Sequence, residues 1–354
     1  MPRLRRSDVT AAGLRRHRRG RRWCYTAADG SEICDPTEIA RIEALVIPPA
    51  WRDVWISPHP NGHIQALGTD AAGRRQYLYH PHWRRQRDAE KFDRVLLMAE
   101  RLPEVRGRLE ANLGTNGLTR ERVLSAAVRL LDLGFFRIGS EEYAEANHTY
   151  GLATLLKEHV TVSRDRIITF DYPAKHGKQR TQTVADEAVC EVVSALKRRR
   201  GGGEELLAFR GPGRTWVHPR SADVNQYLHD LFGVETSAKD FRTWHATVLA
   251  AVGLAVSVPA SSSPSARKRA VARTVTEVSH YLGNTPAVCR ASYIDPRVID
   301  RYDDGITIAD VLGDLGRGTP YGSLATHGAI EQAVLRLLRE PNAVRRGVRV
   351  RKAG

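Results

Sequence analysis

A tyrosine at position 293 stands in a segment whose residue types suit the covalent transfer of a phosphate. An amphipathic helix ends at Gly283, and Asn284, Thr285 and Pro286 start another, because proline is favoured in the first helical turn and a polar residue before it caps free N–H groups. Tyr293 follows about two turns later. A phenol oxygen held there could attack a phosphodiester and form a covalent phosphoester. The structural alternative is a helix cap followed by a core tyrosine.

Three cations that precede this tyrosine could serve the same reaction, which needs positive charge on the non-bridging oxygens and an acid for the departing oxygen. Arg137 follows an apolar run and two phenylalanines, so its guanidinium needs an anion, either a ligand or the carboxylate of Glu141 or Glu142. Arg242 lies among aromatic residues at the start of a helix, where simple packing is the alternative. Lys175 stands in a turn-rich loop, where its amine could protonate a leaving alkoxide or remain solvated.

The elements that must position these residues are of two kinds. Residues 23–84 hold short apolar and aromatic runs broken by turn residues, which predict a small β-rich domain. From residue 85 onward apolar side chains recur at helical spacing, and one β-hairpin around Lys175 interrupts them. We therefore predict an α+β protein: a small N-terminal β-sheet domain, then a larger, mainly α-helical catalytic domain over residues 85–354. Residues 1–22, rich in arginine, predict a basic N-terminal arm without a fixed fold.

Two later stretches are identified by composition. Residues 258–265, rich in serine and proline, predict a surface connector between two helices. Residues 329–338 predict one more amphipathic helix, followed by a basic tail whose role the sequence leaves open.

The charge balance indicates a polyanionic partner. The chain of 354 residues has 55 Lys and Arg against 40 Asp and Glu, a net charge of +15. Such a surface attracts phosphates and speeds encounter, but it selects no nucleotide sequence. The alternative is a generally arginine-rich composition without functional meaning.

Other compositional features exclude several classes of protein. The 4 cysteines form no CxxC pair and have no histidines at zinc-like spacing, so neither a disulfide framework nor a metal site is expected. The N-terminus lacks the apolar stretch of a secretory signal, and no apolar run is long enough to cross a membrane. We therefore expect a cytoplasmic protein.

Taken in order, the reactive segments resemble the catalytic set of the type IB DNA topoisomerases, in particular the poxvirus-like (bacterial) family. The segments read FRIG at 136–139, KHGK at 175–178, FRTWHAT at 241–247 and LGNTPAVCRASY at 282–293. The resemblance also covers the first domain and implies a tyrosine recombinase/topoisomerase IB-like catalytic fold. It implies DNA contacts by these residues of the first domain and the start of the second: Arg74, Arg75, Gln76, Tyr77, Tyr79, Arg84 and Arg85.

The resemblance implies a role for each candidate catalytic residue. Tyr293 would attack the phosphodiester to give a 3′-phosphotyrosyl link and a free 5′-hydroxyl. Arg137 and Arg242 would hold the non-bridging oxygens, and Lys175 would protonate the departing 5′-oxygen. Asn284 departs from the histidine of the poxvirus enzymes, and its amide can donate a hydrogen bond but cannot carry charge.

The same resemblance implies a monomeric enzyme that relaxes positive and negative supercoils of double-stranded DNA in the cytoplasm, at the nucleoid. The covalent link retains the energy of the broken bond, so no ATP is expected. The chain has no GxxxxGK[ST] loop and no DxD-type acidic cluster, so neither a nucleotide nor a metal cofactor is expected. Further phosphate contacts are expected from Arg87 and residues 198–200. The preferred cleavage sequence and any role for His245 stay open.

Two rival functions remain at this point. A tyrosine recombinase-like strand transferase shares the cations and the tyrosine, although it usually carries a histidine-arginine box where this chain has Phe241 and Arg242. A non-catalytic basic DNA-binding protein would use Tyr293 only as a core residue.

Overall fold

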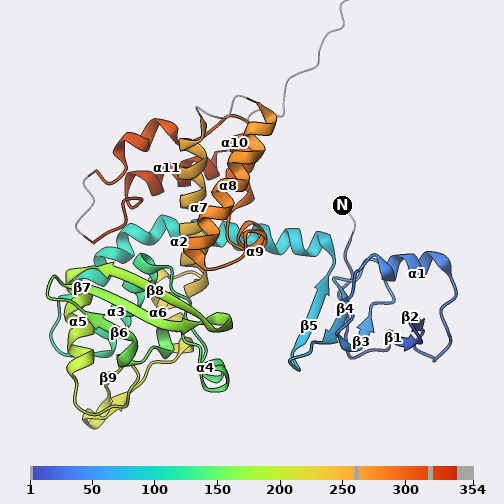
Figure 1. Cartoon of the computed structure of the whole chain (residues 1–354), viewed down its shortest axis with the longest axis horizontal. Helices are drawn as coiled ribbons and strands as arrows, with labels where there is room; N and C mark the ends of the chain where they lie inside the picture. Colours follow the sequence, from blue (N-terminus) through green and yellow to red (C-terminus); the bar gives the residue numbers. More distant parts are fainter. Residues whose placement is uncertain (1–2, 259–262, 318–321, 341–354) are drawn as a thin grey trace, which may run out of the picture. The chain divides into compact units, whose positions relative to one another are not determined.

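The structure is a computed structural model that describes residues 3–258, 263–317 and 322–340. It divides into two compact units at Lys91 and Phe92, and helix α2 (Pro81–Leu113) runs through the boundary. The first unit is built on an antiparallel sheet, and the second is mainly helical with a smaller sheet (Figure 1). This arrangement confirms the predicted α+β class with a small N-terminal sheet.

The first unit is a five-stranded antiparallel sheet with one helix on it. Its strand order is β2-β1-β3-β4-β5. Helix α1 begins where Pro36 can start a helix and Asp35 accepts a hydrogen bond from the Thr37 N–H, and it buries Ile42 against the sheet. The bounds of the elements are β1 Leu14–Arg19, β2 Arg22–Thr26, α1 Pro36–Glu43, β3 Arg52–Ile56, β4 Ile64–Thr69 and β5 Arg75–Tyr79.

Strand β1 lies within residues 1–22, the basic arm that is predicted to have no fixed fold. It pairs with β2 and with β3, and Leu14 is buried in the sheet's core. The Arg16 guanidinium donates to three main-chain carbonyls, at 2.9 to 3.0 Å. Residues 14–19 therefore belong to the sheet. A strand with one apolar residue shows no alternation of apolar and polar side chains, so its sequence resembles a solvated basic segment.

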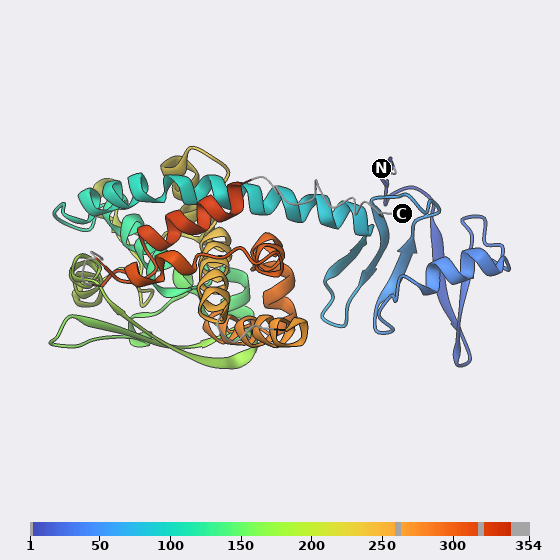
Figure 2. The ribbon, with the colours of Figure 1, turned by 90° about the horizontal axis from the view of Figure 1, so that it is seen from above.

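The second unit packs its helices around one continuous core. Helices α3 and α7 lie at its centre, and α7 is buried on nearly all sides, polar residues included. Figure 2 shows the same helices from above. The helices are α3 Arg120–Gly134, α4 Glu141–Asn147, α5 Glu187–Arg198, α6 Ser221–Phe232, α7 Ala238–Val256, α8 Pro264–Leu282, α9 Pro286–Ser292, α10 Pro296–Asp303 and α11 Ala329–Arg339.

A three-stranded sheet, β6 (Val160–Val162), β7 (Ile167–Ala174) and β8 (Lys178–Ala185), contains the predicted hairpin. Strands β7 and β8 are joined by the single turn Lys175–Gly177. A further short pair is formed by β9 (Phe209–Arg210) and β10 (Trp216–Val217). The predicted helix after residue 328 is α11. The basic tail beyond residue 340 and residues 259–262 of the predicted connector lie outside the described residues.

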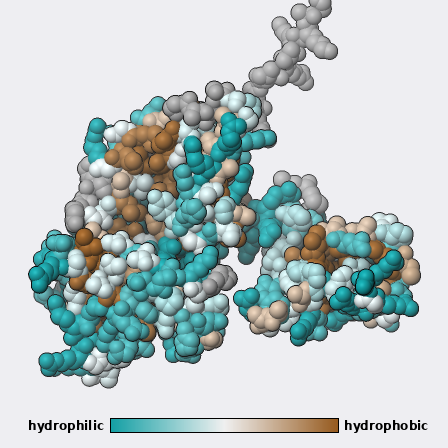
Figure 3. Space-filling view, in the orientation of Figure 1, coloured by the Kyte–Doolittle hydropathy of each residue, from teal (hydrophilic) through white to brown (hydrophobic). Residues whose placement is uncertain are grey.

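Within the described ranges, no helix is both long enough and apolar enough to cross a membrane. Most of the face drawn in Figure 3 is hydrophilic.

Candidate active site

The candidate site is centred on the turn between α8 and α9. Helix α8 ends at Leu282, and Gly283 follows with φ of 60°, a left-handed conformation that glycine adopts without strain. The Thr285 hydroxyl then accepts a hydrogen bond from the Val288 N–H at 3.3 Å, and α9 starts at Pro286. The predicted end of one helix and start of the next are confirmed.

Tyr293 lies at the C-terminal end of α9, half-buried beside two cations. The Arg242 guanidinium carbon is 5.3 Å from the centre of its ring, and the Lys239 amine is 5.8 Å from it. Burial alone raises the pKa of the phenol, but the positive charges of Arg242 and Lys239 outweigh burial and bring that pKa below its ordinary value. The phenol therefore loses its proton more readily than a free tyrosine.

Arg242 is buried in α7, with only 3% of its surface exposed. Its guanidinium donates to the Phe135 carbonyl and, at 2.8 Å, to the Leu282 carbonyl, while its Nε has no hydrogen-bond partner among the described residues. Burial, and then repulsion by Arg137, lower the pKa of Arg242 to about 10. Within the described ranges no carboxylate pairs with it. Arg242 also hydrogen-bonds with the Tyr293 phenol. A buried cation whose partners are all uncharged is costly unless a ligand supplies an anion.

Arg137 extends from the loop after α3 to the same turn. Its Nη2 donates to the Gly283 carbonyl at 3.1 Å and to Oδ1 of Asn284. The possible structural partner Glu141 accepts instead from the main chain and the hydroxyl of Ser221, at 2.7 and 3.0 Å. Oδ1 of Asn284 therefore has a partner. Its Nδ2 is a buried donor with no partner within the described part of the chain. The structure thus brings Arg137, Asn284, Arg242 and Tyr293 together.

Lys175 is placed differently from these four residues. It lies in the turn between β7 and β8, with its side chain exposed. In the described structure no hydrogen bond or ion pair joins it to the other candidates. Its assignment as the acid stays a prediction.

The expected DNA-contacting residues of β5 lie on both sides of the strand. Arg75, Tyr77 and Tyr79 are exposed on one side, and the two tyrosine rings stack with their centres 6.0 Å apart. Gln76 lies on the opposite side and donates to Asp70 at 3.0 Å. Residues separated by two positions in a strand share a face, so only the first three can meet one ligand together. Arg74 is bound to the same Asp70 carboxylate at 2.8 Å, and Arg84 and Arg85 are exposed on α2.

Arg199 is not the phosphate contact that was expected of it. Only 8% of its surface is exposed, and its guanidinium donates to the carbonyls of Leu196, Gly202, Glu205 and Leu206. It therefore stabilises the turn after α5, and its expected role as a phosphate contact is wrong.

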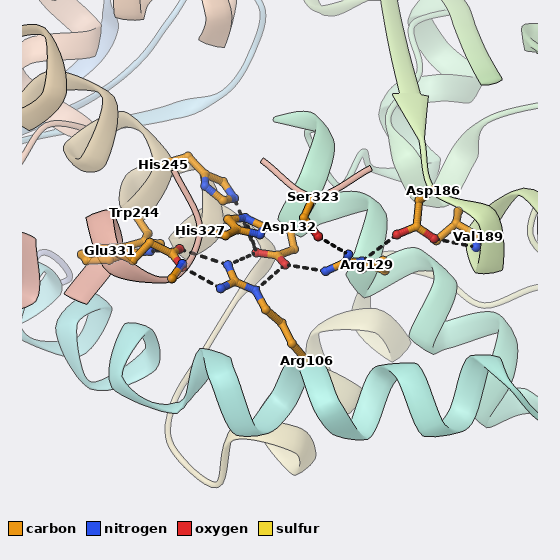
Figure 4. Close-up of polar contacts among 11 residues, drawn as sticks. Arg106, Arg129, Asp132, Asp186, Val189, Trp244, His245, Ser323, His327 and Glu331 are labelled. Atoms are coloured by element: carbon orange, nitrogen blue, oxygen red, sulfur yellow. Dashed lines mark hydrogen bonds and ion pairs between the residues drawn. The ribbon is translucent and has the colours of Figure 1, made fainter. Parts of the chain in front are cut away.

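His245 belongs to a buried group that we call the paired network: Arg106, Arg129, Asp132, Asp186, Glu331, His245 and His327. Figure 4 shows Arg106 between the carboxylates of Asp132 and Glu331, which it binds at 2.6 to 3.0 Å. Burial raises the pKa of Asp132, but the charge of Arg106 outweighs this and holds it well below its usual range. Burial lowers the pKa of His245 to about 4, so the imidazole is neutral.

The paired network contacts residues that hold Arg242 and helix α7 in place. His245 packs edge-on against Phe135, with ring centres 5.3 Å apart, and the carbonyl of Phe135 accepts from Arg242. Trp244 donates to Glu331 at 2.8 Å, which fixes α7 to α11. His245 thus lies in the support of the site, facing Asp132 rather than the Tyr293 phenol.

Two cations beside the site were missed as site residues. Lys239 lies near the Tyr293 ring, and Arg180 of β8 donates to the Tyr281 carbonyl at 2.8 Å. A signal for Arg180 existed in the alternation of β8, where Arg180, Gln182 and Val184 lie on the inward side.

Among the described residues no group of three or more His, Cys, Asp or Glu side chains could hold a metal ion.

Comparison with known proteins assigns both units to one family. Residues 80–310 match the model of the eukaryotic DNA topoisomerase I catalytic core, and residues 22–70 match that of the bacterial DNA topoisomerase IB N-terminal domain. DNA topoisomerase 1B of Acanthamoeba polyphaga mimivirus is 28% identical over 297 residues, which cover 82% of this chain and 88% of that protein. DNA topoisomerase 1B of vaccinia virus (strain Copenhagen) is 24% identical over 242 residues, 67% of this chain and 72% of that protein. With more than half of its length matched by the catalytic-core model, the chain belongs to the type IB DNA topoisomerases.

Proposed function

We propose that this enzyme cleaves one strand of duplex DNA through Tyr293, holds the broken end as a 3′-phosphotyrosyl link, and reseals it after the helix has rotated. One observation carries this proposal. The Tyr293 phenol, with a lowered pKa, lies against Arg242, and Arg242 and Arg137 both lack a carboxylate partner within the described structure. Cations arranged in this way stabilise the charge of a five-coordinate phosphorus.

The cleavage step exchanges one phosphoester bond for another. The phenol oxygen of Tyr293 forms a bond to phosphorus, its proton passes to solvent, and the bond from phosphorus to the 5′-oxygen breaks. Arg137 and Arg242 would donate to the non-bridging oxygens, which carry the greatest charge during the step. Lys175 would give a proton to the 5′-oxygen, and the hairpin turn would bring its amine to the DNA.

Asn284 would assist through its unpartnered Nδ2, which is available to one phosphate oxygen. A neutral amide stabilises charge less than an imidazolium does. Resealing reverses the same steps: the 5′-hydroxyl attacks the phosphotyrosyl phosphorus and the phenol leaves. The number and kind of bonds are conserved, so the cycle needs no ATP, and supercoils of either sign can relax by rotation.

The duplex would be held by phosphate contacts from both units. The face of β5 that presents Arg75, Tyr77 and Tyr79, and the exposed Arg84 and Arg85, are our candidates in the first unit. We propose a monomer as the active form, acting at the nucleoid in the cytoplasm.

The decisive experiment is covalent trapping of DNA. Labelled duplex is mixed with enzyme, quenched with detergent, and examined for label whose retention in a gel is abolished by protease. We expect wild-type enzyme to form this adduct and Tyr293→Phe to form none, with non-covalent DNA affinity changed by no more than a few-fold. Tyr143→Phe, at an exposed tyrosine of α4, is the matched control and should behave as wild type.

The same enzyme preparations, tested for adduct formation and for plasmid relaxation, distinguish the rival functions. A non-catalytic DNA-binding protein forms no adduct, and a recombinase forms one without relaxing plasmid freely. We expect relaxation of positively and negatively supercoiled plasmid in EDTA without ATP. An adduct formed by Tyr293→Phe would exclude the assignment.

A further inference from the structure

Three consecutive carbonyls at the end of α8 each accept a hydrogen bond from a different arginine. Arg180 of β8 donates to the carbonyl of residue 281, Arg242 of α7 to that of residue 282, and Arg137 of the loop after α3 to that of residue 283, at 2.8, 2.8 and 3.1 Å. We call Arg137, Arg180 and Arg242 the arginine trio. Segments far apart in sequence therefore bring three guanidinium groups to one helical turn.

The charges of the arginine trio are mutually unfavourable. Burial, and then the charge of Arg137, lower the pKa of Arg242, while Arg180 adds to the same effect. Burial likewise lowers the pKa of Arg180, and Arg137 lowers it further, although the nearby Tyr172 opposes them. Within the described ranges no carboxylate forms an ion pair with any of the three. The carbonyl end of a helix offsets part of the repulsion, but it carries only about half a charge.

Two of the three guanidinium groups lie beside the same glycine, Gly283. A Cβ atom placed on Gly283 would lie 2.9 Å from Nη1 of Arg180 and 3.8 Å from Nη1 of Arg137. The Arg180 guanidinium also hydrogen-bonds with the Tyr172 hydroxyl, whereas Nη1 of Arg137 has no hydrogen-bond partner among the described residues. The absence of a side chain at position 283 therefore allows both guanidinium groups to lie close to the same main-chain position. A phosphate group, with several acceptor oxygens, fits donors arranged in this way.

The hairpin fixes Arg180 in this orientation before any ligand arrives. Its Nε donates to Oε1 of Gln182 at 2.8 Å, and the Tyr172 hydroxyl lies 3.3 Å from the same oxygen. Tyr172 is directly opposite Arg180 in the pairing of β7 with β8. A preset guanidinium loses little entropy when it binds an anion. The turn of the same hairpin carries Lys175.

We propose that Arg180 is a further catalytic residue, which donates to a non-bridging oxygen of the DNA phosphate that Tyr293 attacks. The inference rests on the proposed function. It differs from a purely structural role, in which Arg180 only fastens the hairpin to α8 through the carbonyl of residue 281.

The test is single-turnover cleavage of a labelled duplex at a mapped site, with enzyme in excess. Arg180→Ala should slow cleavage on the order of a hundredfold, as loss of one charge-stabilising donor does. Arg180→Lys keeps the aliphatic stem and the charge, so it should fold as wild type and recover part of the rate. The matched control is Arg164→Ala, at an exposed arginine before β7, which should cleave as wild type.

A second substrate separates contact from structural support. A methylphosphonate at the cleavage site replaces one charged oxygen by a methyl group and removes the negative charge. If Arg180 meets that charge, the ratio of wild-type to Arg180→Ala rates should fall to about tenfold or less on this DNA, because the charge-assisted part of the interaction is gone. A structural role predicts the same ratio on both substrates and would overturn the inference. So would an unchanged rate for Arg180→Ala and Arg180→Lys. If wild-type enzyme forms no covalent adduct, the proposed function itself fails.

Discussion

The second unit holds two groups of buried or half-buried arginines that differ in the groups that face them. In the paired network, Arg106 and Arg129 meet the carboxylates of Asp132, Asp186 and Glu331. In the arginine trio, the guanidinium groups meet main-chain carbonyls, the amide oxygens of Asn284 and Gln182 and the hydroxyls of Tyr172 and Tyr293, but no carboxylate within the described structure. Opposite charges satisfy the first group without a ligand, whereas the second group retains unmet positive charge. We infer that the first group stabilises the fold and that the second group binds a phosphate of the DNA.

The largest expected effect comes from removing a charge from the paired network. Arg106→Met should lower the free energy of unfolding of the second unit by about 3 to 5 kcal/mol, because Asp132 and Glu331 would remain buried without their partner. Denaturant unfolding measures this value. Single-turnover cleavage by the molecules that remain folded should be close to wild type. An unchanged unfolding free energy would show that the network does not stabilise the fold.

The same substitution in the arginine trio should have the opposite profile. Arg242→Met removes a buried cation that has no carboxylate partner, so we expect stability within about 1 kcal/mol of wild type, since the lost hydrogen bonds are offset by the lost desolvation cost. The cleavage rate should fall on the order of 100- to 1000-fold, which corresponds to about 3 to 4 kcal/mol. Cleavage kinetics and denaturant unfolding on one preparation give both numbers. A loss of stability as large as that of Arg106→Met would remove the distinction between the two groups.

Acid should weaken the paired network through His245. The pKa of this imidazole is about 4 in the folded protein against an ordinary value of 6.5, chiefly because of burial. Between these two pH values the unfolded chain binds more protons than the folded protein. The contribution of His245 to the free energy of unfolding is therefore fully present above pH 6.5 and is lost as the pH falls toward 4, by about 3 kcal/mol in all. Asp132 contributes only below its ordinary pKa near 3.8, so the two windows are separate.

The variant His245→Gln tests the source of this acid dependence. Its unfolding free energy should change less between pH 6.5 and 4 than that of wild type, because the amide does not titrate. His327 also has a lowered pKa, through burial, so a smaller slope should remain. Identical slopes for the variant and wild type would assign the acid sensitivity to other groups.

The sequence predicts those parts of the site that depend on neighbours in the chain. The end of α8 at Gly283 and the start of α9 at Pro286 follow from local backbone preferences, and they bring Tyr293 to its place. The hairpin is equally local, since its strands are joined by one turn. Family resemblance, rather than periodicity, singled out Arg137 and Arg242 for catalysis.

Contacts between distant segments could not be predicted in this way. Arg106 and Glu331 are separated by 225 positions, and no local pattern connects them. Asp132 stands inside an apolar helical run, a pattern that favours a buried partner but does not identify it, and it was not singled out. Strand β1 was missed because its residues are nearly all charged, so pairing with its neighbours rather than a buried face defines it. Arg180 was missed because its partner carbonyl lies 101 positions away.

Substitution of Asn284 should have the smallest effect on cleavage, because its amide would give the phosphate only a neutral hydrogen bond. Asn284→Ala removes one donor worth about 1 kcal/mol, so cleavage should slow by about tenfold or less, and the relative loss should not vary between pH 6 and 8 because no imidazole is involved. Asn284→Asp places a carboxylate where Oδ1 now accepts from Arg137. That change should turn the trio into a second paired network: stability rises, while cleavage falls further than in the alanine variant because Arg137 is no longer free for phosphate. Cleavage by Asn284→Asp at or above the rate of Asn284→Ala would mean that unmet positive charge is not what the site supplies.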